Sequence, residues 1–331
     1  MRLRPLALRL VFIAILASAV IFGWAGGSFT NVGDVWLFAH AGSTLLSANW
    51  SHTFHLPAVQ AGPLELMLTS VAKSIGGGPT GFAIVLDLVC MSAVAAVAVS
   101  LLGRRPADLA FFGIGACLLS LPEEGYRGHP AELLIAVLWL LAAREARRGR
   151  TALAGGLVGL SACFELWGIL GITVLALAPR LRRCGPGLAL AIAVPVACLL
   201  PFVVAGDFHE FQFQWTVTEG PARLLVGYGH PFTWWLRVAE GATVVIVAGL
   251  IARAVRGFRE SIWLIPAITQ IVRIELDPMT YGYYWDTVLI ALLIGTTQIL
   301  LHRHELAVRL AAQFPTLSRR PALVSDLRSD T

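Results

Sequence analysis

Apolar segments separated by short polar stretches run through almost all of this 331-residue chain, and they constrain its fold more than any other feature. Charged residues make up only 14% of the sequence, whereas an average soluble domain carries about 25%. This excludes a soluble enzyme with a membrane tail, a disordered chain and a collagen-like chain. We predict an all-α, polytopic transmembrane helical bundle of about ten spans, near residues 8–26, 79–102, 107–121, 131–146, 152–164, 166–179, 186–205, 238–256, 260–274 and 283–302.

The first apolar segment has two interpretations. A basic start followed by an apolar run and the small residues 17–19 is also typical of a cleaved signal peptide. However, the run continues to Gly26, which is long enough for a transmembrane helix, and further spans follow. An uncleaved first span is therefore the favoured interpretation.

The distribution of basic residues predicts the orientation of the bundle. With the N-terminus inside, 20 of the 25 Lys and Arg residues lie on the cytoplasmic side, as the positive-inside rule requires. This arrangement makes residues 153–178 a tight hairpin with Glu165 near its outer tip. It also makes residues 61–76 a re-entrant or interfacial helix within a long first outer loop, residues 27–78.

The predicted domain organisation is simple. Residues 1–302 form one transmembrane domain, and residues 303–331 form a polar cytoplasmic tail that is partly disordered. The net charge of +5 is then an orientation signal with some attraction to anionic lipid, so the lipid bilayer is a predicted partner and nucleic acid is not. The predicted location is the plasma membrane.

Titratable side chains gather on the predicted outer side. Such clustering is what an extracytoplasmic active site needs, although polar loops exposed to water produce the same composition. The outer set comprises six of the eight histidines and nine acids: His40, His52, His55, His129, His209, His230, Asp34, Glu65, Glu123, Glu124, Asp207, Glu210, Glu219, Glu275 and Asp277.

Three outer loops carry candidate functional residues. Asp34 follows the first span closely, where a carboxylate would meet a lipid headgroup and a water-borne acceptor together; an N-cap role explains it equally simply. The second loop, residues 122–130, holds Arg127, whose planar fork suits a phosphate, but it also fits an ordinary polar turn. The last loop, residues 273–286, joins acids to aromatic residues that form either a wall for a sugar or isoprenoid chain, or an interfacial belt.

Metal binding has weak support in the sequence. The spacings His52-x-x-His55 and Asp207-x-His209-Glu210 resemble metal motifs but lack a defined third ligand. The five cysteines form no Cys-x-x-Cys pair and are interpreted as packing residues. No cofactor is predicted, and a divalent metal stays an open alternative. Glu165 and Asp87 are expected to face the bundle interior rather than lipid.

Several motifs together resemble those of a known superfamily. They are an acid after the first span, a proline helix start in the first outer loop, a Gly-His loop, a glycine-rich middle hairpin and a late Asp-Pro and tyrosine cluster: Asp34, Gly62-Pro63-Leu64, Gly128-His129, residues 154–160, Asp277-Pro278 and Tyr283-Tyr284. With these motifs, residues 8–302 resemble the GT-C integral membrane glycosyltransferases, especially the actinobacterial, mannosyltransferase-like type that uses polyprenyl-phosphate sugars.

The resemblance implies an inverting transfer of a sugar, usually mannose or arabinose, from a polyprenyl-phosphate donor to a lipid or polysaccharide acceptor. Asp34 would be the general base, and Lys73, Arg127 or Arg273 would stabilise the leaving phosphate, with His129 as a hydrogen-bond donor. The full set of expected substrate contacts is Lys73, Glu124, Arg127, His129, Glu165, Arg273, Asp277, Tyr281 and Tyr284. The alternatives are a lipid or sugar transporter or flippase, for which no internal repeat is evident, and a non-catalytic membrane protein.

Overall fold

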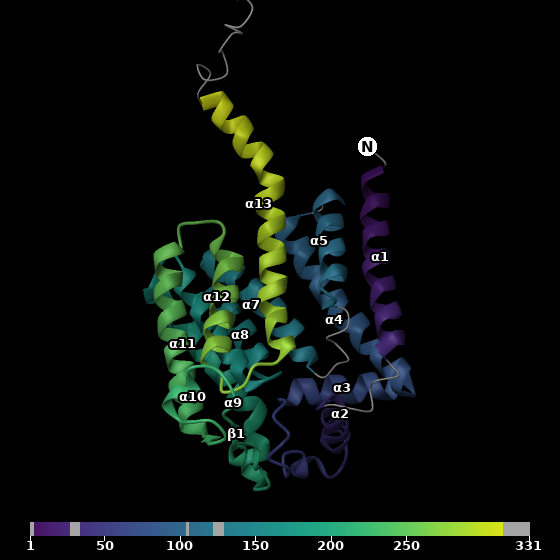
Figure 1. The fold of residues 1–331 in the computed structure, drawn as a ribbon, viewed down its shortest axis with the longest axis vertical. Coiled ribbons are helices and arrows are strands. Elements are labelled where there is room, and N and C mark those ends of the chain that lie inside the picture. The colour runs from purple at the N-terminus through teal and green to yellow at the C-terminus, as the bar shows by residue number, and fades with distance from the viewer. Residues whose placement is uncertain (1–2, 27–33, 104–105, 122–128, 314–331) are drawn as a thin grey trace, which may run out of the picture.

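A computed structural model describes residues 3–26, 34–103, 106–121 and 129–313. Most of this part of the chain is helical, and its single two-stranded sheet pairs β1 (Trp215–Thr216) antiparallel with β2 (Pro231–Phe232). The predicted all-α class is therefore confirmed. The start of α1 (Leu3–Gly26) and the end of α13 (Asp286–Gln313) lie at the same end of the bundle (Figure 1).

Four helices among the described residues are long and apolar enough to cross a membrane. They are α4 (Pro79–Leu102), α9 (Gly185–Ala205), α11 (Trp234–Val255) and the apolar stretch Gly282–Leu300, which includes most of α13. Shorter apolar stretches occur at Phe12–Ala25, Ala107–Leu118, Thr151–Ala162 and Leu166–Leu177. Large apolar side chains on α9 and α11 stay exposed, Trp235 to 83%, as expected of faces that contact lipid.

Proline and glycine residues set several helix boundaries. α3 (Pro63–Gly76) and α7 (Pro130–Arg147) both begin at a proline, whose missing N–H and restricted φ suit the first helical position. α3 ends before Gly77, which adopts a left-handed conformation with φ of 70° and donates its N–H to the Lys73 carbonyl. Short α3 lies across the ends of the longer helices at one end of the bundle, together with α2 (Asp34–Leu45) (Figure 1). We call this end, which also carries β1 and β2, the site end.

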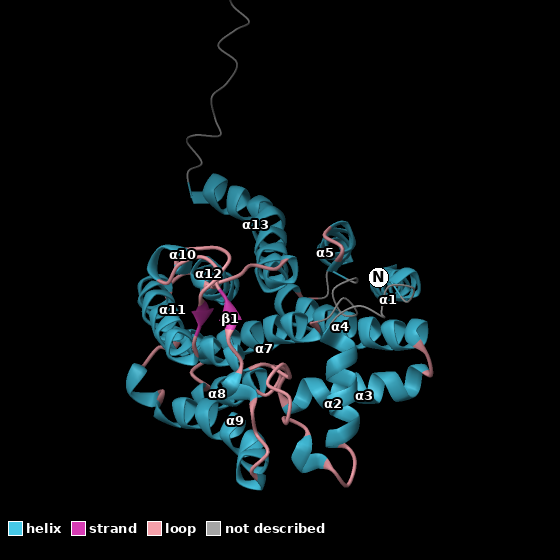
Figure 2. Ribbon diagram, turned by 60° about the horizontal axis from the view of Figure 1, so that its bottom comes forward, coloured by secondary structure: helices cyan, strands magenta, loops and turns pink. Residues whose placement is uncertain are grey.

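The bundle interior is built from two large clusters of buried side chains. One joins α4, α5 (Pro106–Leu118), α7, α12 (Ser261–Leu276) and α13. The other joins α7 to α8 (Thr151–Ala162), α9, α11 and the 3-10 helix η2 (Leu166–Leu177). A smaller aromatic cluster, with Phe38, Phe54 and Phe202, ties α2, α3 and α9 together at the site end. Figure 2 looks onto this end and shows α2, α3, α7, α8 and α9 converging there.

Helices α8 and η2 form the two arms of the middle hairpin. They are joined by a turn at residues 163–165, and Glu165 caps the start of η2. A 3-10 helix rises about 2.0 Å per residue against about 1.5 Å for an α-helix, so this short second arm extends further than an α-helix of equal length. At the other end of the chain, α13 continues past residue 302 to Gln313, so the helix crosses the predicted boundary between membrane domain and tail.

Close packing of α8 on α9 depends on Gly155. A Cβ atom at this position would overlap the carbonyl oxygen of Gly187, whereas a Cβ on the adjacent Gly156 would meet no atom within 4 Å. We expect Gly155→Ala to lower the free energy of unfolding by about 1–3 kcal/mol because the two helices must separate. Gly156→Ala should be neutral or slightly stabilising, since alanine favours the helix. Thermal unfolding of both variants in detergent tests this, and equal melting temperatures would contradict it.

Candidate functional site

A histidine held between two carboxylates forms the centre of the site end. His129 immediately precedes α7, and its Nε2 lies 3.2 Å from Oδ2 of Asp34, the first residue of α2. Its Nδ1 lies 3.1 Å from Oε1 of Glu165 at the hairpin turn. The imidazole ring also stacks on Tyr283, with ring centroids 4.1 Å apart. Three side chains from separate elements therefore fix the orientation of the His129 ring.

The two carboxylates differ in solvent exposure, and both affect the pKa of His129. The Asp34 side chain is 59% exposed, whereas Glu165 is nearly buried. The hydrogen bond from His129 lowers the pKa of Asp34, although partial burial opposes this. Burial disfavours the charged imidazole, but hydrogen bonds to Asp34 and Glu165 outweigh it and raise the pKa of His129 to about 10. Asp34 is thus a solvent-facing anion beside a buried cation at neutral pH.

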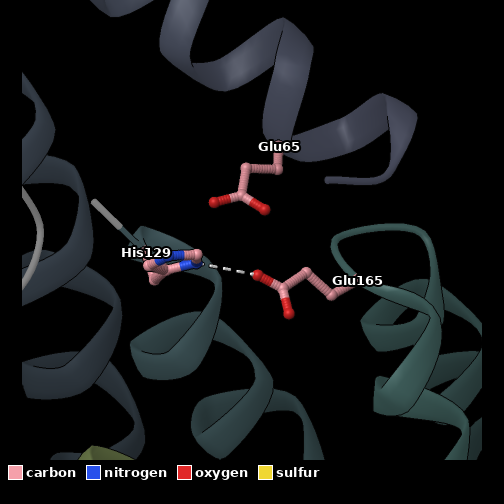
Figure 3. Close-up of side chains that lie close together, drawn as sticks. All are labelled: Glu65, His129 and Glu165. Carbon is pink, nitrogen blue, oxygen red and sulfur yellow. Dashed lines mark hydrogen bonds and ion pairs between the residues drawn. The ribbon is translucent and has the colours of Figure 1, made fainter. Parts of the chain in front are cut away.

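Glu65 is a third carboxylate at this centre. It lies in the first turn of α3 and is completely buried. Figure 3 shows its carboxylate directed towards His129 and Glu165. Burial and the nearby Glu165 raise the pKa of Glu65 well above its usual range, and His129 and the Ala131 amide offset this only in part.

The backbone explains why Glu65 and Glu165 meet. The Gly62 N–H donates to the Phe164 carbonyl, and the Leu64 N–H donates to the Cys163 carbonyl at 3.0 Å. These bonds join the start of α3 to the hairpin turn. A Cβ at Gly62 would overlap the Cys163 carbonyl oxygen, so only glycine permits this approach.

Arg273 is connected to the centre but is not open to solvent. The Trp167 indole N–H donates to Glu165, and the Trp167 ring lies 3.9 Å from the Arg273 guanidinium carbon. Arg273 is buried and donates to Oε1 of Glu132 at 3.3 Å. In this structure Arg273 forms an internal ion pair with Glu132, and its predicted phosphate contact stays a prediction.

Asp277 is likewise engaged within the protein. Arg237 donates to both of its carboxylate oxygens, at 3.0 and 3.3 Å, and to Glu240 at 2.8 Å. The Asp277 side chain is fully buried under this arginine. Its predicted contact with substrate stays a prediction. Arg237 also lies over the Trp215 ring, which couples the small sheet to this pair.

The remaining residues predicted to contact substrate differ in their exposure and in their position relative to His129. Tyr281 is exposed and stacks on Tyr283 at 5.3 Å, which extends the ring stack from His129 towards solvent, whereas Tyr284 is buried. Lys73 lies two turns along α3 from Glu65, over the Trp36 ring. Glu124 and Arg127 fall outside the described residues.

The two histidine motifs of the predicted outer loops meet in space. His52 Nδ1 lies 2.5 Å from Asp207 Oδ2, and His209 is 3.8 Å from the same carboxylate. His55 and His209 otherwise bind backbone carbonyl oxygens. The neighbouring Glu210 is buried, which raises its pKa well above the usual range.

Four residues at or beside the centre were not among the predicted contacts: Glu65, Glu132, Trp167 and Tyr283. Tyr283 belongs to a motif noted in the sequence, and Glu65 directly follows the Gly62-Pro63-Leu64 motif and is one of the nine predicted outer acids. The signal available for Glu65 was an acid in the first turn of a mostly apolar helix, which is costly unless it serves a site. Nothing in the local sequence distinguishes Glu132 or Trp167, because their partners lie far away along the chain.

Comparison with known proteins yields no relative: no family model, no curated protein and no solved structure matches this chain.

Proposed function

We propose that this chain is a membrane glycosyltransferase that moves a sugar from a polyprenyl-phosphate donor to an acceptor hydroxyl, with Asp34 as the general base. The observation that carries the proposal is the Asp34–His129–Glu165 arrangement. It combines a solvent-facing carboxylate with a buried histidine that orients it, at an end of an apolar helical bundle. The predicted ten-span topology, with both termini in the cytoplasm, would place this end outside the membrane.

The chemistry follows from the state of each group. Asp34 removes the proton of the acceptor hydroxyl as that oxygen attacks the anomeric carbon. The bond from the anomeric carbon to the phosphate oxygen breaks, and the polyprenyl phosphate leaves with both bonding electrons. A single displacement of this kind inverts the anomeric centre.

Charge stabilisation at the leaving phosphate needs a cation. Arg273 and Arg237 are paired with Glu132 and Asp277, and both ring nitrogens of His129 face carboxylates. Lys73, which lies over the Trp36 ring, is therefore the remaining predicted cation among the described residues. The ring stack of Tyr281 and Tyr283 leads from His129 towards solvent and is suited to contact a sugar ring. The exposed apolar faces of α9 and α11 suit a polyprenyl chain in the bilayer.

The direct test is Asp34→Asn in membranes supplied with mannosyl or arabinosyl phosphopolyprenol. We expect sugar transfer to fall by at least about 100-fold, the usual size of a lost general base, while membrane insertion is unchanged. Asp207→Asn is the matched control, because Asp207 is at the same end but pairs with His52 instead of His129. Full transfer activity in the Asp34 variant would overturn the proposal, as would donor translocation without any transfer by the wild type.

A further inference from the structure

Three acid–base side chains from separate elements converge at one point of the site end. Glu65 comes from α3, His129 from the start of α7 and Glu165 from the hairpin turn between α8 and η2. One ligand-type atom from each residue lies within 4.8 Å of the other two (Figure 3). No two of these residues are close in sequence, so the grouping results from the tertiary fold.

The burial and poor hydrogen bonding of the Glu65 carboxylate indicate that it binds a ligand. The Glu65 side chain is 0% exposed, and neither carboxylate oxygen makes a hydrogen bond of normal geometry, although the Ala131 amide acts weakly on it. His129, by contrast, already bonds Asp34 and Glu165. An unpaired carboxylate without solvent is costly unless it is neutralised or binds a cation. Because this carboxylate points at His129 and Glu165, the missing partner would lie between the three side chains.

We propose that Glu65, His129 Nδ1 and Glu165 bind one divalent transition-metal ion of the Zn²⁺ or Mn²⁺ class. A donor set of one imidazole nitrogen and two carboxylate oxygens suits these ions, whereas Mg²⁺ and Ca²⁺ prefer oxygen donors alone. Two carboxylates and a neutral imidazole also balance the charge of a divalent ion. The site does not depend on glycosyl transfer and would exist for any reaction that the chain performs.

The separations are compatible with such an ion. Two ligands that each lie ~2.1 Å from a tetrahedral ion are ~3.4 Å apart. His129 Nδ1 and Glu165 Oε1 are 3.1 Å apart, and the Glu65 carboxylate oxygen lies within 4.8 Å of both, so binding would require it to move closer by roughly 1.4 Å at most. Three protein ligands leave a fourth position open, as in catalytic zinc sites.

Asp34 would support the proposed metal site indirectly, by holding the His129 ring. Its Oδ2 accepts from His129 Nε2 at 3.2 Å, on the side of the ring away from Nδ1. A carboxylate in this position fixes the tautomer that presents Nδ1 to a metal and makes the imidazole a better ligand. With an ion bound, the positive charge at the centre would come from the metal instead of the imidazolium.

Metal binding by the full-length protein in detergent tests the proposal without any assay of activity. After removal of metal with a chelator, we expect one Zn²⁺ per chain by titration calorimetry and elemental analysis, and weaker binding of Mg²⁺ and Ca²⁺. Glu65→Gln and Glu165→Gln should each weaken binding at least about 100-fold. Asp34→Asn should weaken it by about 10-fold or more, as for other residues that orient a ligand.

Glu210→Gln is the matched control, because Glu210 is also buried at the site end with an unpartnered carboxylate oxygen but lies outside the cluster. It should leave Zn²⁺ affinity unchanged. Electron spin echo spectra of the Mn²⁺ form should show coupling to one histidine nitrogen that is lost in His129→Gln. Absence of stoichiometric binding, or full affinity in both glutamine variants, would overturn the proposal; in the latter case the ion would be bound elsewhere, such as at His52 and His209.

Discussion

Replacing Arg273 with leucine should lower the free energy of unfolding by about 3–5 kcal/mol, one of the largest effects expected of any single substitution in this chain. The substitution leaves the Glu132 carboxylate buried without its cation. It also removes a guanidinium that lies between the Trp167 and Tyr284 rings. Gln270, which also donates to Glu132, can compensate only in part, because an amide carries no charge. Reversible unfolding in mixed micelles measures the difference.

A double variant separates the lost ion pair from lost packing. Arg273→Leu with Glu132→Leu removes both charges, and replacing a whole buried pair by apolar side chains is often close to neutral. We therefore expect the double variant to be more stable than Arg273→Leu alone. Arg182→Leu is the control, since Arg182 is exposed and its loss should change stability by less than about 0.5 kcal/mol. A double variant as unstable as the Arg273 single variant would show that Glu132 is not the source of the cost.

The sequence predicted the helical class and the local features of the site end better than its contacts. Pro63 and Pro130 mark helix starts through the chemistry of one residue, and Gly77 marks an end in the same way. The interruption at Glu165 marks a turn in an apolar run. Asp34, His129 and Glu165 were each singled out for local reasons, and the structure brings all three together.

What the sequence did not predict depends on contacts between distant segments. The ion pairs Arg273–Glu132 and Arg237–Asp277 join residues that are far apart in the sequence. Local sequence therefore does not show that these charged side chains already have partners within the protein. The same is true of Glu65, which reaches His129 because Gly62 packs against the Cys163 carbonyl. The sequence also does not predict that Leu166–Leu177 is a 3-10 helix, because a continuous apolar run has no periodicity that distinguishes helix types.

His129→Gln should remove several kcal/mol of stability near neutral pH and abolish an alkaline slope in the stability profile. The folded-state pKa of His129, about 10, is raised above the ordinary value of 6.5. Its contribution is therefore fully present below pH 6.5 and is lost as pH rises through 10. Each pKa unit corresponds to about 1.4 kcal/mol, so a shift of this size is worth several kcal/mol. Unfolding measured from about pH 2 to pH 11, with a chelator present to exclude metal, gives both profiles.

Asp34 changes the dependence of stability on pH at acidic pH, and its contribution is lost as the pH falls rather than as it rises. Because His129 lowers the pKa of Asp34 below its ordinary value of 3.8, this contribution is present above that value and is lost as pH falls through the lowered pKa. Wild-type protein should therefore be most stable between about pH 4 and 6.5, with stability declining towards pH 10. The glutamine variant lacks the titrating ring, so its profile should be flatter above pH 6.5. Parallel profiles for the two proteins would show that the buried imidazole is uncharged in the folded state, and the ion pairs with Asp34 and Glu165 would then not form.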